Sequence, residues 1–271
     1  MFTLEPHGPD TFVGQGPQYP WGGLYGGQIV AQALRAAAAT VPAEYLPHSI
    51  RAYFIRPGDH REPVRYEVDR IRNGRSFVTR RVVARQAIGA ILNAECSFQV
   101  DEPSLALQPV DAPEVRGRDG VANTSFSSDF ERRRTEPTGG ADGVGARRDG
   151  AGRVTAWMRV VHDLTELRRS PDEPFLDQCW LAYLSDDLAT DTVRTAIRDT
   201  LGEPDKELHG VSLDHTIWFH RPLRADQWHL HDFTCHHANG ARGLAVGHVF
   251  TADGTHAATV AQEVLVREPK P

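Results

Sequence analysis

The sequence predicts an α+β protein of two similar units, each a buried helix wrapped by an antiparallel β-sheet. The first observation is an internal repeat. The stretches His48–Pro57 and Ser212–Pro222 each carry a hydroxyl residue and a histidine near the start, an aromatic middle and a closing Arg-Pro. The second observation is that the spacing continues, because an Asn-Gly turn follows each stretch at a similar distance. Such a repeat is typical of two copies of one supersecondary unit.

The composition is typical of a soluble globular protein. The chain has 271 residues, of which 40% are apolar and 24% are charged. The net charge of −6 argues against a nucleic-acid partner. Three widely spaced cysteines favour a reducing compartment over a disulfide framework. No run of about 18 apolar residues and no secretory leader is seen, so we expect no membrane partner and a cytoplasmic location.

The N-terminal unit, predicted over residues 1–100, opens with glycines that lead into a helix. Apolar residues recur at helical spacing from Ile29 to Thr40, and Pro42 ends the helix. Turns rich in Gly, Pro and Asn then separate strand-like runs. These runs are His48–Arg56, Val64–Ile71, Phe77–Arg85 and Ala90–Val100. The order predicts one helix followed by a four-stranded antiparallel meander.

Residues 101–153 have a different character, because Asp, Pro, Gly, Ser and Arg dominate. Glycine is concentrated in Thr138–Gly152. A segment of this composition buries little apolar surface, so we interpret it as a linker that is mobile in part.

The C-terminal unit, predicted over residues 154–271, begins with a strand at Trp157–Val161. A helix follows from Pro174 to about Leu188, and its apolar residues cover nearly the whole circumference, which is typical of a buried helix. A short outer helix and four strands complete the unit. They are Thr192–Leu201, Ser212–His220, Trp228–Cys235, Arg242–Thr251 and Ala257–Val266.

Short motifs occur along both units in a definite order. They are Leu24–Gln28, His48–Asp59, Asn73–Phe77, Ala182–Asp186, Asp214–Pro222 and Gln262–Glu263. Together they resemble the acyl-CoA thioesterase II family, over roughly residues 20–100 and 155–267. The resemblance implies a double hotdog fold and hydrolysis of an acyl-CoA substrate to a fatty acid and CoA, without a cofactor. It also implies a homo-oligomer, because hotdog sheets often extend from chain to chain.

The resemblance further implies the catalytic residues. The family orients an attacking water with an Asp, a Thr and a Gln, which correspond by motif to Asp186, Ser212 and Gln262. Ser212 departs from the family's Thr but keeps the hydroxyl. Asp186 suits a general base, because apolar surroundings and the negative end of a helix dipole both disfavour the charged carboxylate. The competing interpretations are a solvated helix end for Asp186, a strand-start residue for Ser212 and an exposed position for Gln262.

Further residues are candidates for substrate binding. Backbone N–H groups of Gly26, Gly27 and Gln28 open the first helix and could form an oxyanion hole. The competing interpretation is that the glycines only allow tight packing.

The remaining substrate contacts are predicted from charge and apolarity. Arg75, Arg221 and Arg242 occupy turns where they could bind the CoA phosphates. Apolar residues around Trp180 and Tyr183 could line an acyl channel.

Two other chemistries have weaker support in the sequence. Asp214, His215 and Ser212 suggest a serine hydrolase triad, but no Gly-x-Ser-x-Gly elbow is present, and neighbours along a strand point to opposite faces. A metal site is suggested by one face of a later strand, which carries His229, His231, Cys235 and His237. Their spacing matches no zinc pattern, so we expect no metal.

Two further functions stay open for the same fold. A hotdog hydratase or dehydratase would need a histidine acting with a carboxylate, and His215 and His220 lack a clear partner in the sequence. A non-catalytic acyl-CoA-binding protein would need no base at all. The presence of an Asp, a hydroxyl and a Gln together favours the hydrolase.

Overall fold

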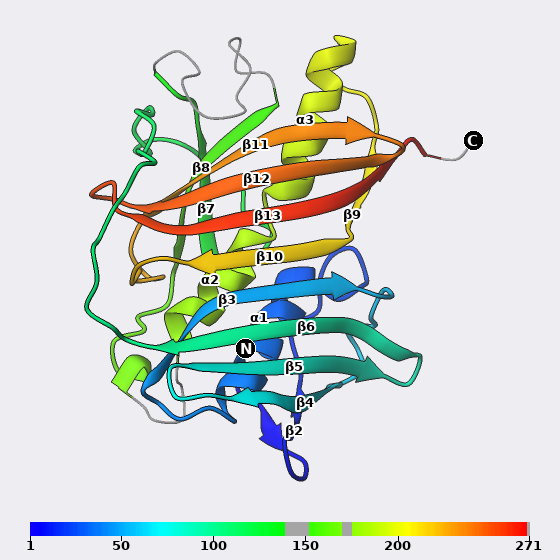
Figure 1. Cartoon of the computed structure of the whole chain (residues 1–271). Helices are drawn as coiled ribbons and strands as arrows, with labels where there is room; N and C mark the ends of the chain where they lie inside the picture. The colour runs from blue at the N-terminus through cyan, green and yellow to red at the C-terminus, as the bar shows by residue number, and fades with distance from the viewer. Residues whose placement is uncertain (139–151, 170–174, 270–271) are drawn as a thin grey trace. The chain divides into compact units, whose positions relative to one another are not determined.

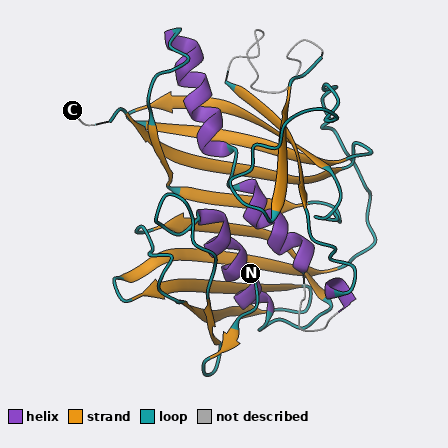
Figure 2. Cartoon of the chain, turned by 180° about the vertical axis from the view of Figure 1, so that it is seen from behind, coloured by secondary structure: helices purple, strands orange, loops and turns teal. Residues whose placement is uncertain are grey.

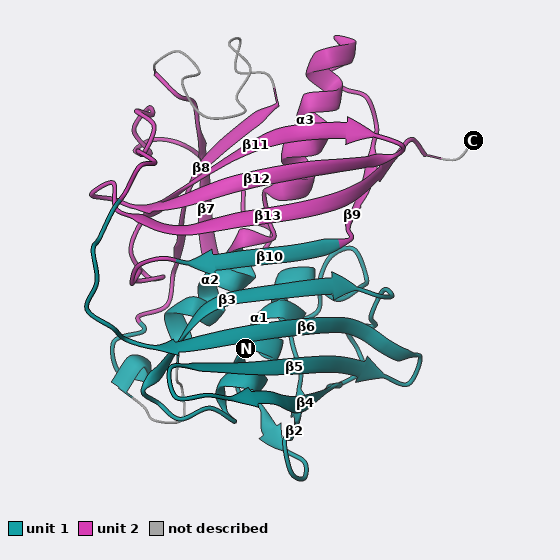
Figure 3. Cartoon of the chain, in the orientation of Figure 1, with its two compact units in different colours: residues 1–107, 164–184, 214–219 teal, residues 108–163, 185–213, 220–271 magenta. Residues whose placement is uncertain are grey.

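The computed structural model describes residues 1–138, 152–169 and 175–269 and has the predicted α+β architecture, with helices set against antiparallel strands (Figure 1 and Figure 2). Internal contacts divide the chain into two compact units (Figure 3). Unit 1 comprises residues 1–107, 164–184 and 214–219; unit 2 comprises 108–163, 185–213 and 220–271. The tandem division into 1–100 and 154–271 is a different partition and stays a prediction.

The sheet of unit 1 is antiparallel, in the order β1-β2-β4-β5-β6-β3-β10. Its strands are β1 (Glu5–Pro6), β2 (Thr11–Gly14), β3 (Tyr45–Phe54), β4 (Val64–Asn73), β5 (Phe77–Gln86), β6 (Gly89–Val100) and β10 (Asp214–Phe219). The predicted strands are confirmed, but the four-stranded meander is wrong, because β3 pairs with β6 rather than with β4. This pairing places β3, with its buried Ile50 and Ala52, inside the sheet between β6 and β10.

Helix α1 (Gly26–Ala38) packs against the sheet of unit 1 and is buried from Gly27 to its end. Its Ala-rich sequence allows the close approach to the strands. Two glutamines of the helix are buried as well, and tyrosine hydroxyls form hydrogen bonds with both of them. Tyr19 Oη donates to Gln28 Oε1 at 2.8 Å, and Tyr66 Oη donates to Gln32 Oε1 at 2.6 Å. Hydrogen bonds as well as apolar packing therefore hold the helix in its position.

The strands of unit 2 are also antiparallel, in the order β7-β8-β11-β12-β13, with β9 paired to β13. They are β7 (Phe130–Thr135), β8 (Arg153–Val160), β9 (His209–Ser212), β11 (His229–Asn239), β12 (Arg242–Thr251) and β13 (His256–Arg267). Helix α3 (Ala189–Leu201) packs on strands of this sheet. The predicted strand over Ser212–His220 is two strands, because the strand is interrupted at Leu213, between β9 and β10.

The structure corrects two further predictions, one for the linker and one for the bounds of the helices that follow it. The predicted linker contains strand β7, which pairs with β8 and buries Phe130, so part of the linker belongs to the sheet. The predicted helix ends earlier than expected, as α2 (Leu176–Ser185), and α3 begins three residues before the predicted Thr192. The predicted helix start at Pro174 and nearly all of the Gly-rich stretch lie outside the described residues.

A 3₁₀ turn, η1 (Leu167–Arg169), precedes α2 in the sequence. None of the helices in the described part of the chain is long and apolar enough to cross a membrane.

Candidate active site

The three residues predicted for catalysis lie together in unit 2 and form one hydrogen-bonded chain. Ser212 Oγ donates to Asp186 Oδ1 at 3.0 Å. Gln262 Nε2 donates to Ser212 Oγ at 2.7 Å. The three side chains come from the turn after α2, the end of β9 and the middle of β13. They are far apart in the sequence, so tertiary structure alone assembles them.

Strand pairing brings Ser212 beside Gln262. Ser212 stands opposite Val264 in the antiparallel pair of β9 and β13, and the backbone N–H of Leu213 donates to Glu263 O at 2.9 Å. Gln262 and Val264 share one face of β13, because side chains alternate along a strand. Gln262 is therefore a diagonal neighbour of Ser212, within reach of a long side chain. Gln262 is fully buried, so the interpretation as an exposed residue is wrong.

Asp186 sits at the corner between α2 and α3. The apolar residues Leu184 and Leu188 flank this corner and are fully buried. Asp186 is only 6% exposed, which contradicts a solvated helix end. A buried carboxylate needs hydrogen-bond donors, and the Ser212 hydroxyl supplies one.

The neighbouring Asp187 has a different environment. Its carboxylate accepts from Arg132 Nη1 of strand β7 at 2.7 and 2.6 Å. Burial raises the pKa of Asp187 to about 6, although the nearby Arg132 guanidinium lowers it. Arg132 was missed at the sequence level, because it lies in the predicted linker and its partner is 55 positions away.

The hydrogen-bonded chain has a definite direction. The single hydroxyl proton of Ser212 points at the Asp186 carboxylate, so the Ser212 oxygen accepts from Gln262. A chain of this kind ends on a carboxylate that can take up a proton, which is the property of a general base. Among the described residues, no histidine bonds the Ser212 hydroxyl, so the arrangement differs from a Ser-His-Asp triad.

The predicted oxyanion segment begins helix α1 in unit 1. A Cβ on Gly27 would lie 2.3 Å from the backbone oxygen of Tyr183, so glycine is required for this close approach. Tyr25 Oη donates to the same oxygen at 2.9 Å. The Gln28 N–H donates to Tyr25 O at 3.2 Å. These contacts favour a packing role, and the oxyanion role of Gly26, Gly27 and Gln28 stays a prediction.

The predicted phosphate-binding arginines are spread over both units. Arg75 is exposed in unit 1. In unit 2, Arg221 Nη1 donates to Gln108 Oε1 at 3.2 Å, and Arg242 Nε lies 3.3 Å from Glu263 Oε1. Their role in binding CoA stays a prediction.

The residues proposed for an acyl channel belong to an aromatic cluster of unit 1. The ring centroids of Trp180 and Phe2 are 4.8 Å apart, and those of Trp180 and Tyr183 are 5.6 Å apart. Trp180 is 5% exposed and Tyr183 is fully buried, so both rings are part of the apolar interior.

The histidines of strand β11 form a buried pair. His229 Nδ1 and His231 Nε2 are 2.9 Å apart, and both rings are almost completely buried. Burial lowers the pKa of His229 to about 4 and lowers the pKa of His231 well below its ordinary value. Cys235 bonds the backbone of His237 instead of joining the pair. Over residues 1–138, 152–169 and 175–269, no group of three or more His, Cys, Asp or Glu side chains is arranged to hold a metal.

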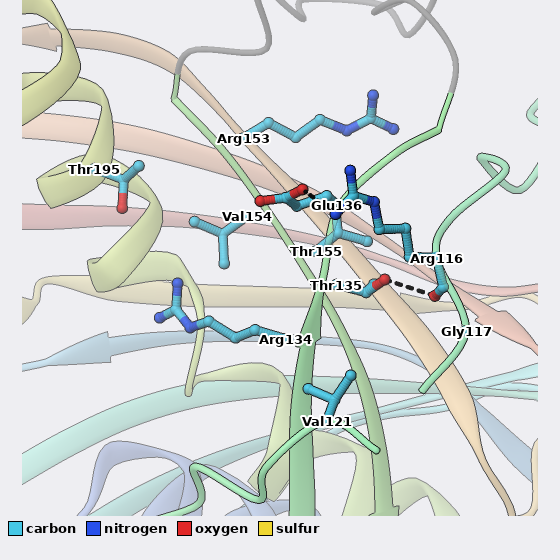
Figure 4. A pocket seen from close by; sticks show the side chains of 10 residues that line it. All are labelled: Arg116, Gly117, Val121, Arg134, Thr135, Glu136, Arg153, Val154, Thr155 and Thr195. Carbon is cyan, nitrogen blue, oxygen red and sulfur yellow. Dashed lines mark hydrogen bonds and ion pairs between the residues drawn. The ribbon is translucent and has the colours of Figure 1, made fainter. Parts of the chain in front are cut away.

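A pocket of about 380 Å³ opens elsewhere in unit 2, between β7, β8 and α3 (Figure 4). Three arginines line it, but carboxylates pair each of them. Arg153 bonds Asp232 at 2.7 Å, Arg134 bonds Asp191 at 2.5 Å and Arg116 lies 3.3 Å from Glu136. None of the three predicted catalytic residues lines this pocket, so it is distinct from the candidate active site.

The fold agrees with comparisons to known families. Residues 16–99 match the family model of the acyl-CoA thioesterase N-terminal domain, and residues 107–266 match that of the C-terminal domain. The chain therefore belongs to the acyl-CoA thioesterase family and is an enzyme of the thioester hydrolase class.

Individual relatives cover almost the whole chain. Acyl-CoA thioesterase 2 of Haemophilus influenzae is 33% identical over 98% of this chain and 96% of its own. The crystal structure of acyl-CoA thioesterase II TesB2 from Mycobacterium marinum matches with a TM-score of 0.81 at 32% identity, over 100% of this chain and 98% of that chain. A protein with a hot dog fold from Alicyclobacillus acidocaldarius matches with a TM-score of 0.75 over 98% of this chain and 96% of that chain. At 18% identity, that likeness concerns the fold alone.

Proposed function

We propose that the protein hydrolyses fatty acyl-CoA to a free fatty acid and CoA, with an attacking water held by Asp186, Ser212 and Gln262. The continuous hydrogen-bonded chain from Gln262 through Ser212 to Asp186 is the observation that carries this proposal. The names of the relatives, acyl-CoA thioesterase 2 and acyl-CoA thioesterase II, support the choice of substrate.

In the proposed mechanism, Asp186 is the general base. Its carboxylate accepts a proton from the water while the water oxygen forms a bond to the thioester carbon. The carbonyl electrons move onto oxygen and give a tetrahedral oxyanion. When this oxyanion collapses, the carbon–sulfur bond breaks and CoA leaves as a thiolate, which takes up the proton held by Asp186. No acyl-enzyme forms, because water is the nucleophile.

Ser212 and Gln262 position the water in this proposal. A hydroxyl oxygen has two lone pairs, and Gln262 uses one of those on Ser212. The second lone pair can accept a proton of the water and so turn the water oxygen toward the substrate. Because the buried Gln262 fixes the hydroxyl before substrate arrives, the orientation is established in advance.

We also propose that the chain is a double hotdog with tandem units at 1–100 and 154–271. The internal repeat, the helices packed on antiparallel strands and the likeness to a hot dog fold protein support this proposal. A homo-oligomer in the cytoplasm is the corresponding expectation for the assembly.

A free-thiol release assay over acyl-CoAs of several chain lengths tests the function. We expect one thiol per acyl-CoA consumed, and we expect Asp186→Asn to abolish most of this turnover. Binding of acyl-CoA without thiol release would indicate a non-catalytic acyl-CoA-binding protein. Hydration of an enoyl-CoA without thiol release would indicate a hydratase. In the structure, His220 Nε2 lies 2.8 Å from the Thr259 hydroxyl.

A further inference from the structure

We infer that Arg132 and Asp187 form a positioning pair, which holds the corner between α2 and α3 so that Asp186 meets Ser212. This inference rests on the proposed function of Asp186 as the base. Neither Arg132 nor Asp187 belongs to the hydrogen-bonded chain of the site, so their action is indirect.

The contact between the two residues is close and buried. Arg132 Nη1 donates to Asp187 Oδ1 at 2.7 Å and to Oδ2 at 2.6 Å. The Arg132 side chain is 13% exposed and that of Asp187 is 6% exposed. Hydrogen bonds between charged groups are strong and directional, and burial protects them from screening by salt. Because Asp187 directly follows Asp186, fixing its side chain restricts the backbone that carries the base.

The segment that precedes strand β7 holds the guanidinium from the other side. Arg132 Nε donates to Thr124 Oγ1 at 3.2 Å, and Nη2 donates to the backbone oxygen of Thr124. The Thr124 N–H donates in return to Arg132 O at 2.9 Å, and the Arg132 N–H donates to Asn123 Oδ1 at 3.0 Å. Arg132 is therefore held in one place by its own strand and the preceding segment, and Asp187 is the group that it fixes.

The charges at the corner explain why such a pair is needed there. Asp186 and Asp187 at the corner and Asp191 in the first turn of α3 lie within six consecutive residues. The pKa of Asp187 is raised by burial, lowered by Arg132, and raised again by the nearby charges of Asp191 and Asp186. Without Arg132, the buried Asp187 would lose its ion partner, which favours uptake of a proton by its carboxyl or movement of the corner toward solvent. That movement would carry Asp186 away from Ser212.

A second pair from the same strand offers a matched control. Arg134 lies two residues further along β7 and therefore on the same face. It bonds Asp191 in the first turn of α3 at 2.5 Å, with the two side chains 40% and 33% exposed. This pair also ties β7 to α3, but it does not touch the residues of the corner.

The experiment compares Arg132→Gln, Asp187→Asn and Arg134→Gln in the full-length protein, with thiol release and Tm measured for each. We expect Arg132→Gln and Asp187→Asn to lower kcat by about 10–100-fold with KM within about threefold, because misplacement of a base affects the chemical step more than binding. Arg134→Gln should keep kcat within about twofold, whatever its Tm. Arg132→Lys keeps one charged donor for both oxygens of Asp187 and should recover a large part of kcat.

Three outcomes would overturn the inference. The first is a normal kcat for Arg132→Gln, and the second is an equal loss of kcat in Arg132→Gln and Arg134→Gln. The third is a loss in Arg132→Gln that follows Tm alone and that Arg132→Lys does not relieve. If Arg132→Gln fails to fold, Asp187→Asn beside Arg134→Gln makes the same comparison, because Asp187→Asn keeps the shape of the side chain and removes its charge.

Asp186→Asn belongs in the same series, because it separates the two proposals. A fully active Asp186→Asn protein would remove the proposed catalytic function. An inactive Asp186→Asn beside an unimpaired Arg132→Gln would remove the positioning role alone.

Discussion

The Ser212 hydroxyl donates its only proton to Asp186 Oδ1 at 3.0 Å, across 26 positions of sequence. This bond joins the end of strand β9 to the corner that follows helix α2. Since Gln262 donates to the same hydroxyl, each member of the trio is held by another before any substrate binds. Changes to single members should therefore affect the chemical step more than the fold.

Asp186→Asn is the first test of this arrangement. Asparagine keeps the shape and an acceptor oxygen for Ser212, but it cannot take up the proton of the water. We expect kcat to fall by roughly 10²–10⁴-fold with little change in Tm. Steady-state thiol release together with a thermal unfolding scan checks both parts. Near-normal turnover by the folded variant would remove Asp186 as the base.

Gln262→Ala should loosen Ser212 without removing the base. The amide donates to Ser212 Oγ at 2.7 Å, and its loss frees the hydroxyl to rotate. We expect kcat to fall by about 10–10³-fold. Gln262→Glu is a useful companion, because it keeps the size but replaces the donor with a second acceptor. A rise in KM alone in Gln262→Ala would instead make Gln262 a substrate-binding residue.

Local signals in the sequence predicted most of the elements in this structure. Periodicity and glycine turns located α1 and the long strands, because those patterns depend on neighbours in the chain. The pairing of β3 with β6 escaped prediction, because local sequence carries no information on which strand a given strand will meet. The trio of Asp186, Ser212 and Gln262 came from the order of motifs rather than from physical signals in the residues.

Strand β7 and its arginines could not be predicted for a related reason. Its sequence, Phe-Glu-Arg-Arg-Arg-Thr, is mostly charged and resembles a solvated loop. In the structure Arg132 and Arg134 bond Asp187 and Asp191, which lie more than 50 residues away, while Arg133 pairs with Glu131 of the same strand. A charged strand becomes stable only when such distant partners fold beside it.

Gly27→Ala should destabilise the protein. The added Cβ would lie 2.3 Å from the backbone oxygen of Tyr183 and 2.6 Å from the Tyr25 ring, and a backbone atom cannot easily move away. We expect a loss of about 1–3 kcal/mol in the free energy of unfolding, the usual effect of overpacking. Gly117→Ala is the matched control, since nothing lies within 4 Å of its Cβ. Equal urea midpoints for the two variants would contradict the close approach of Gly27.

The buried His229–His231 pair predicts a loss of stability in acid. The pKa of His229 falls to about 4 in the folded protein, so between about pH 6.5 and pH 4 the unfolded chain binds a proton that the folded chain does not. The contribution of His229 to the free energy of unfolding is fully present above pH 6.5. It decreases by up to about 1.4 kcal/mol per pH unit as the pH falls toward 4. Asp187, whose pKa is raised to about 6, opposes this trend below that pH.

Urea unfolding at pH 7 and pH 5 measures this effect. His229→Gln should shrink the difference between the two midpoints, while the exposed His7→Gln should leave it as in the wild type. An unchanged difference in His229→Gln would show that the pair does not control acid stability.

Ser212 is where the chain departs from its family, and two substitutions there separate catalysis from strand structure. Ser212→Thr restores the family residue, keeps the hydroxyl and adds a methyl group. We expect kcat within about tenfold of the wild type, because one such contact is worth about 1–1.5 kcal/mol. Ser212→Ala removes both the donor to Asp186 and the acceptor for Gln262. It should lower kcat by about 10–10³-fold, up to the effect of one preorganised hydrogen-bonding group.

Melting temperature distinguishes the two roles of Ser212. Threonine favours a strand more than serine does, and alanine favours it less. If Ser212 only stabilises strand β9, Tm should differ between Ser212→Thr and Ser212→Ala while kcat stays unchanged. If Ser212 orients the water, kcat should differ strongly between Thr and Ala while the Tm values stay close together. Equal kcat for Ser, Thr and Ala would exclude Ser212 from the site, and Asp186 and Gln262 would then need another residue to connect them.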